Sequence, residues 1–153
     1  MAVSEAVQDI LKDKVVCELG CAVGDNMLFM SRYAKEVVGM ELKRYRYKHA
    51  EKRGVRIIVG DYFKDPLPKA DVYYFWPDNG QKDNEALVER ILSQPDFKGT
   101  IVVAGDMGFP QEIPSVKRCV ERWGGRLMEV EFNEGPRHRQ SGTFLLAIIE
   151  VTE

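Results

Sequence analysis

The sequence is poor in the residues that build metal sites and disulfide frameworks. It has two histidines and three cysteines, Cys17, Cys21 and Cys119. The odd number of cysteines, and the apolar neighbours of Cys17, do not fit a disulfide framework. Cys17 and Cys21 lack CxxC spacing and no second pair follows, so we expect no zinc site. His49 lies in a polar segment, where we expect it to be solvated.

The sequence also lacks an excess of positive charge and a long apolar run. Its 22 lysines and arginines are set against 24 acidic residues, which gives a formal net charge of −2. Without a global basic field, any contact with nucleic acid must be local. No apolar run is long enough to cross a membrane, and the N-terminus has early acids without an apolar core segment. We therefore expect no signal peptide, no membrane span and a cytoplasmic location.

What the sequence does have is a regular alternation of apolar runs and helical patterns. At 153 residues, we expect one domain that spans residues 1–153. Strands are predicted at Val15–Leu19, Glu36–Glu41, Val55–Val59, Asp71–Phe75, Gly99–Ala104, Met128–Phe132 and Phe144–Ile149. Helices are predicted at 2–12, 25–34, 44–53, 87–92 and 113–123. The helix at 44–53 is polar and basic, and Gly54 follows it as a stop signal.

The alternation of strands and helices indicates βαβ units. It predicts a doubly wound α/β fold with a mainly parallel sheet and helices on both faces. The last two strands have no helix between them, so we expect the last strand to be antiparallel. In Met128–Phe132 apolar residues alternate with acids, as in a half-exposed strand, whereas Phe144–Ile149 is continuously apolar and should be buried on both faces.

The first predicted strand leads into a glycine turn. Gly20 follows Val15–Leu19, and Gly24 comes four residues later. Met27 and Leu28 then begin a helical pattern, and we expect both on its apolar face. Glycine lets a ligand approach the backbone, because it has no side chain and tolerates unusual backbone angles. The helix start presents free backbone N–H groups, so this unit could hold a ligand.

This stretch resembles the first motif of class I S-adenosylmethionine (SAM)-dependent methyltransferases, which is an acid, any residue and then Gly-x-Gly-x-Gly. Here the motif is Glu18-Leu19-Gly20-Cys21-Ala22-Val23-Gly24, with Ala22 where the middle glycine usually lies. The resemblance covers about residues 2 to 151 and implies seven strands in the order 3-2-1-4-5-7-6. It also implies that Gly20, Cys21, Ala22 and Gly24 wrap the methionine part of SAM. Glu18 would hold the ammonium group, directly or through water.

Two further acids follow the second and third strands. Ligands of open α/β sheets bind at the carboxyl ends of strands, beside the topological switch point. The resemblance implies that Glu41 accepts hydrogen bonds from the ribose diol and that Asp61 accepts from the adenine amino group. Leu42 and Tyr62 would then flank the adenine ring, and Gly60, directly before Asp61, is placed with the cofactor-binding residues. Taken alone, Glu41 also fits a solvated strand end, and Asp61 fits a turn cap.

The fourth strand leads into the predicted acceptor side. Phe75-Trp76-Pro77-Asp78 stands where amine-methylating relatives often carry Asn/Asp-Pro-Pro-Tyr/Phe. An aromatic residue replaces the polar one that would accept from a target amine, which argues against methylation of nucleobase amines. We place Phe75 with the cofactor residues and predict Trp76, Pro77 and Asp78 on the acceptor side. The ring of Trp76 could face a cation, Asp78 could orient or deprotonate the acceptor, and Asp106 is a further candidate.

A basic group in the last predicted loop could belong to the same side. Arg137, His138 and Arg139 could meet a phosphate or carboxylate of the acceptor, although a solvated loop is the better explanation for them. The chain has little room for a substrate-capping domain. The expected open face suits a protein or RNA acceptor, or a cap from a partner subunit, and a small-molecule acceptor also stays open.

Two other functions fit parts of this pattern. A nicotinamide-dinucleotide-binding domain also has an acid about 20 residues after its glycine turn, and Glu41 would serve. Its fingerprint G-x-G-x-x-G, started at Gly20, meets Ala22 and Asp25 in place of the later glycines, and an acid there would repel pyrophosphate. The other alternative is a SAM-binding or scaffold subunit that partners an active enzyme.

Overall fold

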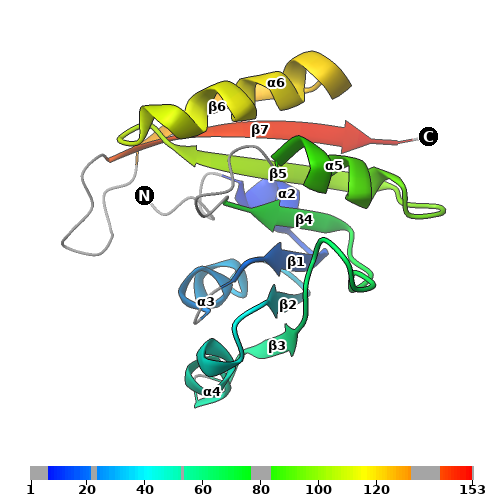
Figure 1. The fold of residues 1–153 in the computed structure, drawn as a ribbon, viewed down its shortest axis with the longest axis vertical. Helices are drawn as coiled ribbons and strands as arrows, with labels where there is room; N and C mark the ends of the chain where they lie inside the picture. Colours follow the sequence, from blue (N-terminus) through cyan, green and yellow to red (C-terminus); the bar gives the residue numbers. More distant parts are fainter. Residues whose placement is uncertain (1–6, 22–23, 53, 77–83, 132–141, 153) are drawn as a thin grey trace.

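The computed structural model describes residues 7–21, 24–52, 54–76, 84–131 and 142–152. In these residues one seven-stranded sheet has the order β3-β2-β1-β4-β5-β7-β6 (Figure 1). The strands are β1 (Val15–Leu19), β2 (Glu36–Glu41), β3 (Arg56–Val59), β4 (Val72–Phe75), β5 (Gly99–Asp106), β6 (Arg126–Glu131) and β7 (Thr143–Val151). Neighbours among β1 to β5 pair in parallel, while β7 is antiparallel to both β5 and β6. The predicted strand order and the antiparallel last strand are confirmed.

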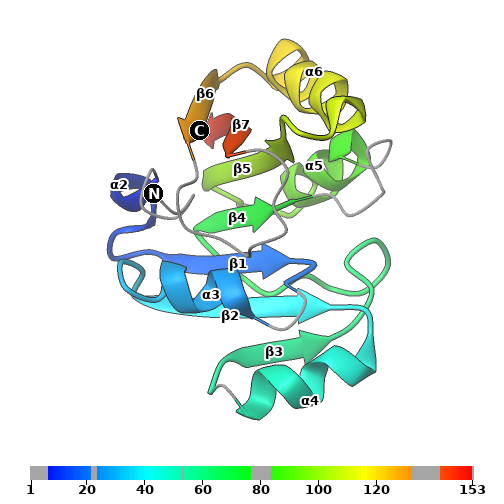
Figure 2. The same cartoon turned by 90° about the vertical axis from the view of Figure 1, so that its left-hand side faces the viewer.

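Helices cover both faces of this sheet, as predicted (Figure 2). They are α2 (Gln8–Leu11), α3 (Asp25–Met30), α4 (Arg44–Lys52), α5 (Asn84–Leu92) and α6 (Ile113–Trp123), with a short 3₁₀ turn η2 (Pro110–Glu112) before α6. Side chains of α2, α3 and α4 join the core on one face, and those of α5 and α6 join the core on the other. No helix was predicted between β3 and β4, and residues 60–71 form none.

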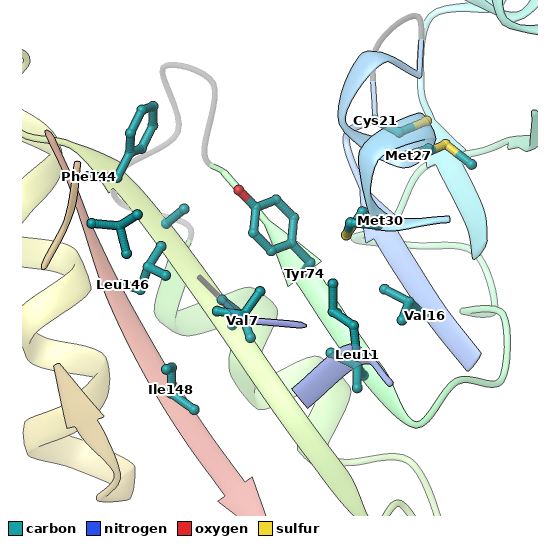
Figure 3. Packing of buried hydrophobic residues seen from close by; sticks show 14 of the residues in the cluster. Val7, Leu11, Val16, Cys21, Met27, Met30, Tyr74, Phe144, Leu146 and Ile148 are labelled. Atoms are coloured by element: carbon teal, nitrogen blue, oxygen red, sulfur yellow. The ribbon is translucent and has the colours of Figure 1, made fainter. Parts of the chain in front are cut away.

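The two cores arise because successive residues of a strand point to opposite faces. Val16 and Tyr74 face α2 and α3 and pack with Leu11 and Met30, while Phe75 belongs to the core under α5 and α6. Figure 3 shows the first of these cores, in which Tyr74 lies between the residues of α3 and those of β7. The central strands are thus buried on both faces, as expected for a parallel sheet.

The first helix after the glycine turn is shorter than predicted. The sequence suggested residues 25–34, but α3 ends at Met30, and the Ser31 hydroxyl donates to the Leu28 carbonyl. Met27 and Met30 are buried, whereas the side chain of Leu28 is 41% exposed. The prediction that Leu28 lies on the apolar face is wrong, because a six-residue helix presents only one narrow stripe to the sheet.

The carboxyl-terminal strands show the predicted contrast in burial. Phe144 to Ile149 of β7 are all buried, while Glu129 and Glu131 of β6 are exposed and Val130 is buried. Strand β5 runs two residues further than predicted, to Asp106, because its pairing with β7 continues to that residue. Residues 132–141, and residues 2–6 of the predicted helix at 2–12, lie outside the described residues.

The described part of the chain contains no helix with the length and apolar character needed to cross a membrane. All three cysteines, Cys17, Cys21 and Cys119, are buried and none of them forms a disulfide. Among the same residues, no group of histidine, cysteine and acidic side chains is arranged to hold a metal ion.

Candidate functional site

The candidate residues lie where the parallel strands end. Strand β1 pairs with β2 on one side and with β4 on the other, so the chain changes direction across the sheet at β1. The arrowheads of β1, β2, β3 and β4 point to the same edge in Figure 2. This is the topological switch point at which open α/β sheets bind ligands.

The glycine turn lies directly at the end of β1. The Gly20 N–H donates to the Met40 carbonyl of β2 at 2.8 Å, and the backbone of Gly20 is left-handed with φ of 75°. A methyl group on Gly20 would lie 3.4 Å from Tyr62 Oη, so the Tyr62 ring stands beside the turn. The Gly24 N–H donates to the Cys21 carbonyl at 3.0 Å, which closes the turn before α3. The predicted order of strand, glycine turn and helix is therefore present.

The side chain of Cys21 is part of the core. It is buried over β2, where a Cβ on Gly39 would lie 2.5 Å from Cys21 Sγ. Burial raises the pKa of this thiol well above its ordinary value. Any contact of Cys21 with a ligand therefore falls to its backbone. Ala22, the next predicted residue of the turn, lies outside the described residues.

Glu18 is a buried acid, and one of its two carboxyl oxygens has no hydrogen-bond partner among the described residues. Asn26 of α3 donates from Nδ2 to Glu18 Oε2 at 3.0 Å, while Oε1 has no hydrogen-bond partner among the described residues. Burial raises the pKa of Glu18 to about 8; the Asn26 bond opposes this, and the charges of Asp25 and Glu41 add to it. A buried polar atom without a partner costs free energy, so this oxygen suits an incoming donor or cation.

Asn26 was missed by reasoning from the sequence. It lies in the first turn of α3, where an asparagine has no distinctive pattern of its own. The available signal was its place two residues after Gly24, where a helix that starts beside β1 brings it back over Glu18. Its amide bonds one Glu18 oxygen, while the other oxygen has no hydrogen-bond partner among the described residues.

Glu41 occupies the matching place at the end of β2. It is only 3% exposed, and its Oε2 accepts from the Lys43 N–H at 2.8 Å. That burial departs from the solvated strand end that the residue alone would suggest. The next residue, Leu42, has an exposed fraction of 54%, so an apolar side chain stands in solvent beside the carboxylate.

The segment after β3 forms a tight turn next to Glu41. The Gly60 N–H donates to the Glu41 carbonyl at 3.0 Å, which extends the pairing of β3 with β2 to the predicted site. Asp61 Oδ1 accepts from the Phe63 N–H at 2.9 Å, and the Asp61 N–H donates to Asp65 Oδ2 at 2.7 Å. Asp61 is therefore a turn cap through one oxygen, the alternative that its sequence context left open.

At the end of β4 the structure places two aromatic residues differently. Phe75 is buried in the core under α5 and α6, so only its backbone reaches the strand end. Trp76 is half-buried, and its ring meets Phe144 of β7 edge-to-face with centroids 5.3 Å apart. Pro77 and Asp78, and also Arg137, His138 and Arg139, lie outside the described residues.

Glu112, an acid that was not predicted from the sequence, contacts both Trp76 and Asp106. The Trp76 indole N–H donates to Glu112 Oε1 at 2.7 Å, and the Asp106 N–H donates to the same oxygen at 3.0 Å. Glu112 lies in η2 and is buried, and Asp106 is fully buried at the end of β5. Sequence reasoning missed Glu112 because an acid just before a helix ordinarily reads as a favourable helix-terminus charge.

The acids near the ends of β1 and β2 disfavour the binding of a dinucleotide. Glu18, Asp25 and Glu41 lie near enough for the two other carboxylates to raise the pKa of Glu18. Such a set of acids favours a cation and repels a pyrophosphate. The antiparallel β7 between β5 and β6 also differs from the 3-2-1-4-5-6 order of dinucleotide-binding folds. Both observations count against the nicotinamide alternative.

Comparison with models of known protein families finds no match, and comparison with curated protein sequences finds none either. Solved structures do match. An RNA methyltransferase from Salinibacter ruber, in complex with S-adenosyl-L-homocysteine, is 18% identical with a TM-score of 0.67, over 98% of this chain and 88% of that one. The chain has the class I methyltransferase fold.

Two further solved structures show how widely this methyltransferase fold is used. A dimethyladenosine transferase from Plasmodium falciparum is 18% identical with a TM-score of 0.64; the match covers 97% of this chain but only 60% of that one. A precorrin 8w decarboxylase from Methanobacterium thermoautotrophicum is 16% identical with a TM-score of 0.69, over 99% and 90% of the two chains. The fold is shared at low identity, so the reaction has to be argued from the site.

Proposed function

We propose that this chain is a SAM-dependent methyltransferase with a macromolecular acceptor. Glu18 binds the ammonium group of SAM, and the backbone of the turn from Gly20 to Gly24 holds its methionine part. Glu41 binds the ribose diol, and Leu42 with Tyr62 flanks the adenine ring. These residues lie at or just after the ends of β1, β2 and β3, which are neighbours in the sheet, and this supports the proposal.

The observation that carries this proposal is the Glu18 carboxylate. Its Oε1 is buried without a partner among the described residues, and Glu18 lies two residues before the left-handed Gly20 that begins the turn. An ammonium group would supply the missing donor and would offset the mutual repulsion of Glu18, Asp25 and Glu41. These residues therefore fit SAM, whose amino-acid end carries that ammonium group.

The acceptor residues have a simpler task. When bound, SAM supplies an activated methyl group on a sulfonium. A nucleophilic acceptor then needs alignment more than acid–base help. Trp76, fixed by Glu112 and Phe144, offers a rigid aromatic face at the end of β4. Asp106 lies beside it, and Pro77 and Asp78 continue from it in sequence, so we place the acceptor over this group.

RNA is the first acceptor to test. The Salinibacter protein is described as an RNA methyltransferase and the Plasmodium protein as a dimethyladenosine transferase, which supports an RNA substrate here. Trp76 stands in place of the polar residue that accepts from an amine, which makes a site other than a nucleobase amine the better choice. A ribose hydroxyl or a ring position satisfies that condition.

The experiment is methyl transfer from labelled SAM into a cell extract separated into RNA, protein and small-molecule fractions. We expect label in the RNA fraction, and loss of that label with Glu41→Ala. A protein that binds SAM but labels nothing in any fraction would instead be a SAM-binding subunit of a larger complex. Label confined to small molecules would contradict the macromolecular acceptor.

A further inference from the structure

The charge of this chain is unevenly distributed. Residues 43–56 contain seven of the 22 lysines and arginines and only one of the 24 acids, a local net charge of +6 in a chain whose net charge is −2. This segment is helix α4 with its flanking residues. The remaining residues of the chain therefore have a net negative charge.

The cations of α4 form an exposed stripe. Arg44, Lys48 and Lys52 are spaced by four residues, which places them on successive turns about 6 Å apart along one side of the helix. All three are exposed, and none of them forms an ion pair with a carboxylate among the described residues. The opposite side of α4 contributes Ala50 and Tyr47 to the core, so the helix is anchored while its basic side faces solvent.

The stripe works against the stability of the helix. The first turn of α4 has no acid and begins with Arg44, although the helix dipole favours negative charge there. Like charges four residues apart also repel each other by a few tenths of a kcal/mol per pair. The stripe therefore destabilises the helix in the free protein. A bound anion would offset this cost, because it would neutralise the repelling charges.

The stripe starts at the candidate site. Glu41 ends β2, and α4 begins at Arg44, three residues later. Figure 2 shows α4 along the outer edge of the sheet beside β3, and Trp76 lies three strands away, at the end of β4. Three strand spacings are about 14 Å, so a molecule that touches both places must span at least that distance.

We propose that the Arg44–Lys48–Lys52 stripe binds the phosphate backbone of a single-stranded RNA, whose target nucleotide then reaches the end of β4. The choice of RNA as acceptor rests on the function proposed above. Regularly spaced cations suit a chain of phosphates, and a flexible strand can follow both the helix and the sheet edge. The net negative charge of the remaining residues disfavours nonspecific binding of the same strand elsewhere.

The test is a fluorescence-anisotropy titration of the full chain with a labelled single-stranded RNA of about 20 nucleotides, between 50 and 200 mM KCl. The variant carries Arg44→Gln, Lys48→Gln and Lys52→Gln. For single strands the slope of log K against log salt is about −0.7 for each phosphate neutralised, so losing three contacts should reduce the slope by about 2. We expect at least tenfold weaker binding at 100 mM KCl.

A matched control removes the same charge elsewhere. Lys12, Lys117 and Arg126 are exposed and lie on other elements, so their triple change to glutamine keeps net charge equal to that of the stripe variant. The control should bind RNA within twofold of the parent. If both variants weaken equally, or the parent shows no salt-dependent RNA binding, the proposal is wrong. Sedimentation with phosphatidylserine vesicles is the parallel arm, and binding to vesicles but not to RNA would assign the stripe to a lipid surface instead.

SAM binding by the same variants separates this inference from the proposed function. The stripe variant should bind SAM as the parent does, since none of the three side chains is assigned to the cofactor. SAM binding without RNA binding would overturn the stripe and leave the cofactor site intact. RNA binding through the stripe without SAM binding would support the stripe and overturn the proposed cofactor site.

Discussion

Buried acids are hydrogen-bonded differently in two regions of the molecule, at the ends of β1 and β2 and at the ends of β4 and β5. At β1, Glu18 has one oxygen bonded by Asn26 and the other without a partner among the described residues. At β4 and β5, Glu112 Oε1 accepts from both the Trp76 indole and the Asp106 backbone. One acid keeps a binding capacity that the protein does not use, while the other holds neighbouring groups in position.

The difference distinguishes an acid that can bind a ligand from an acid that holds neighbouring side chains in position. A buried carboxyl oxygen without a donor raises the free energy of the folded protein until a ligand supplies the donor. A carboxylate with two donors stabilises the geometry around it instead, here the orientation of an aromatic ring. The contrast supports the proposal that the β1–β2 end binds a charged cofactor and that the β4–β5 end positions an acceptor.

The largest expected effect comes from Glu18. Its pKa is raised from 4.5 to about 8, so the folded protein holds a proton that the unfolded chain releases, and stability falls as the pH rises between these values. Between pH 5 and pH 8 the loss is about 3 kcal/mol, and Glu18→Gln should remove it. Urea unfolding of both proteins over this range measures the difference, and an equal pH dependence in the two would contradict the burial argument. Exposed Glu131→Gln serves as the control.

Glu41 should give the next largest effect. Glu41→Ala should weaken SAM binding by about 1.5–3 kcal/mol, through loss of charge-assisted bonds to the ribose, with the fold retained. Glu36→Ala changes the same residue type at the other end of the same strand, where the side chain is exposed and paired with Arg56. Calorimetry should show an effect only for Glu41, and equal affinity in parent and Glu41→Ala would remove the ribose assignment.

Trp76 tests the other end of the comparison. Trp76→Phe removes the donor to Glu112 and should lower methyl transfer about tenfold, because the acceptor loses a fixed surface. SAM affinity should change by less than twofold, since the cofactor residues lie at β1 to β3. Single-turnover rates at saturating SAM measure the first quantity and calorimetry the second. If SAM affinity fell as much as the rate, the two regions would not have the separate roles proposed for them.

Leu42 should give the smallest effect. Its side chain is exposed, so Leu42→Ala should leave the melting temperature unchanged. If the side chain lies against the adenine ring, SAM affinity should fall by less than about 1 kcal/mol. Leu127 is a similarly exposed leucine on β6, and Leu127→Ala is the control. Identical SAM affinities for both variants and the parent would place the adenine ring elsewhere.

The sequence predicted the local features at the ends of β1 and β2 better than the contacts around Trp76. The turn at Gly20 and the acid at the end of β2 follow from local patterns, which survive folding because each lies within one strand and its turn. The order of the strands is not a local property, and it was implied by the family resemblance. Glu112 could not be predicted, since it meets Trp76 across 36 residues and through a 3₁₀ turn without a distinctive pattern. The burial of Phe75 and the exposure of Leu28 depended on tertiary packing, which periodicity alone does not fix.

Asp61 shows a limit of a different kind. The sequence allowed both an adenine contact and a turn cap, and the structure displays the cap through Oδ1. A carboxylate has two oxygens with several acceptor positions, so the cap and the proposed adenine contact are compatible. The proposed assignment therefore concerns the remaining acceptor capacity of Asp61.

The central claim is that the β1–β2 end binds SAM, and calorimetric titration of the full chain tests it most directly. SAM and S-adenosylhomocysteine should both bind, with SAM in the micromolar range, or on the order of −8 kcal/mol. Because binding of the ammonium group requires ionised Glu18, SAM affinity should also rise between pH 6 and pH 8, and this rise should be absent in Glu18→Gln. Binding of NADH without binding of SAM or S-adenosylhomocysteine would contradict the account.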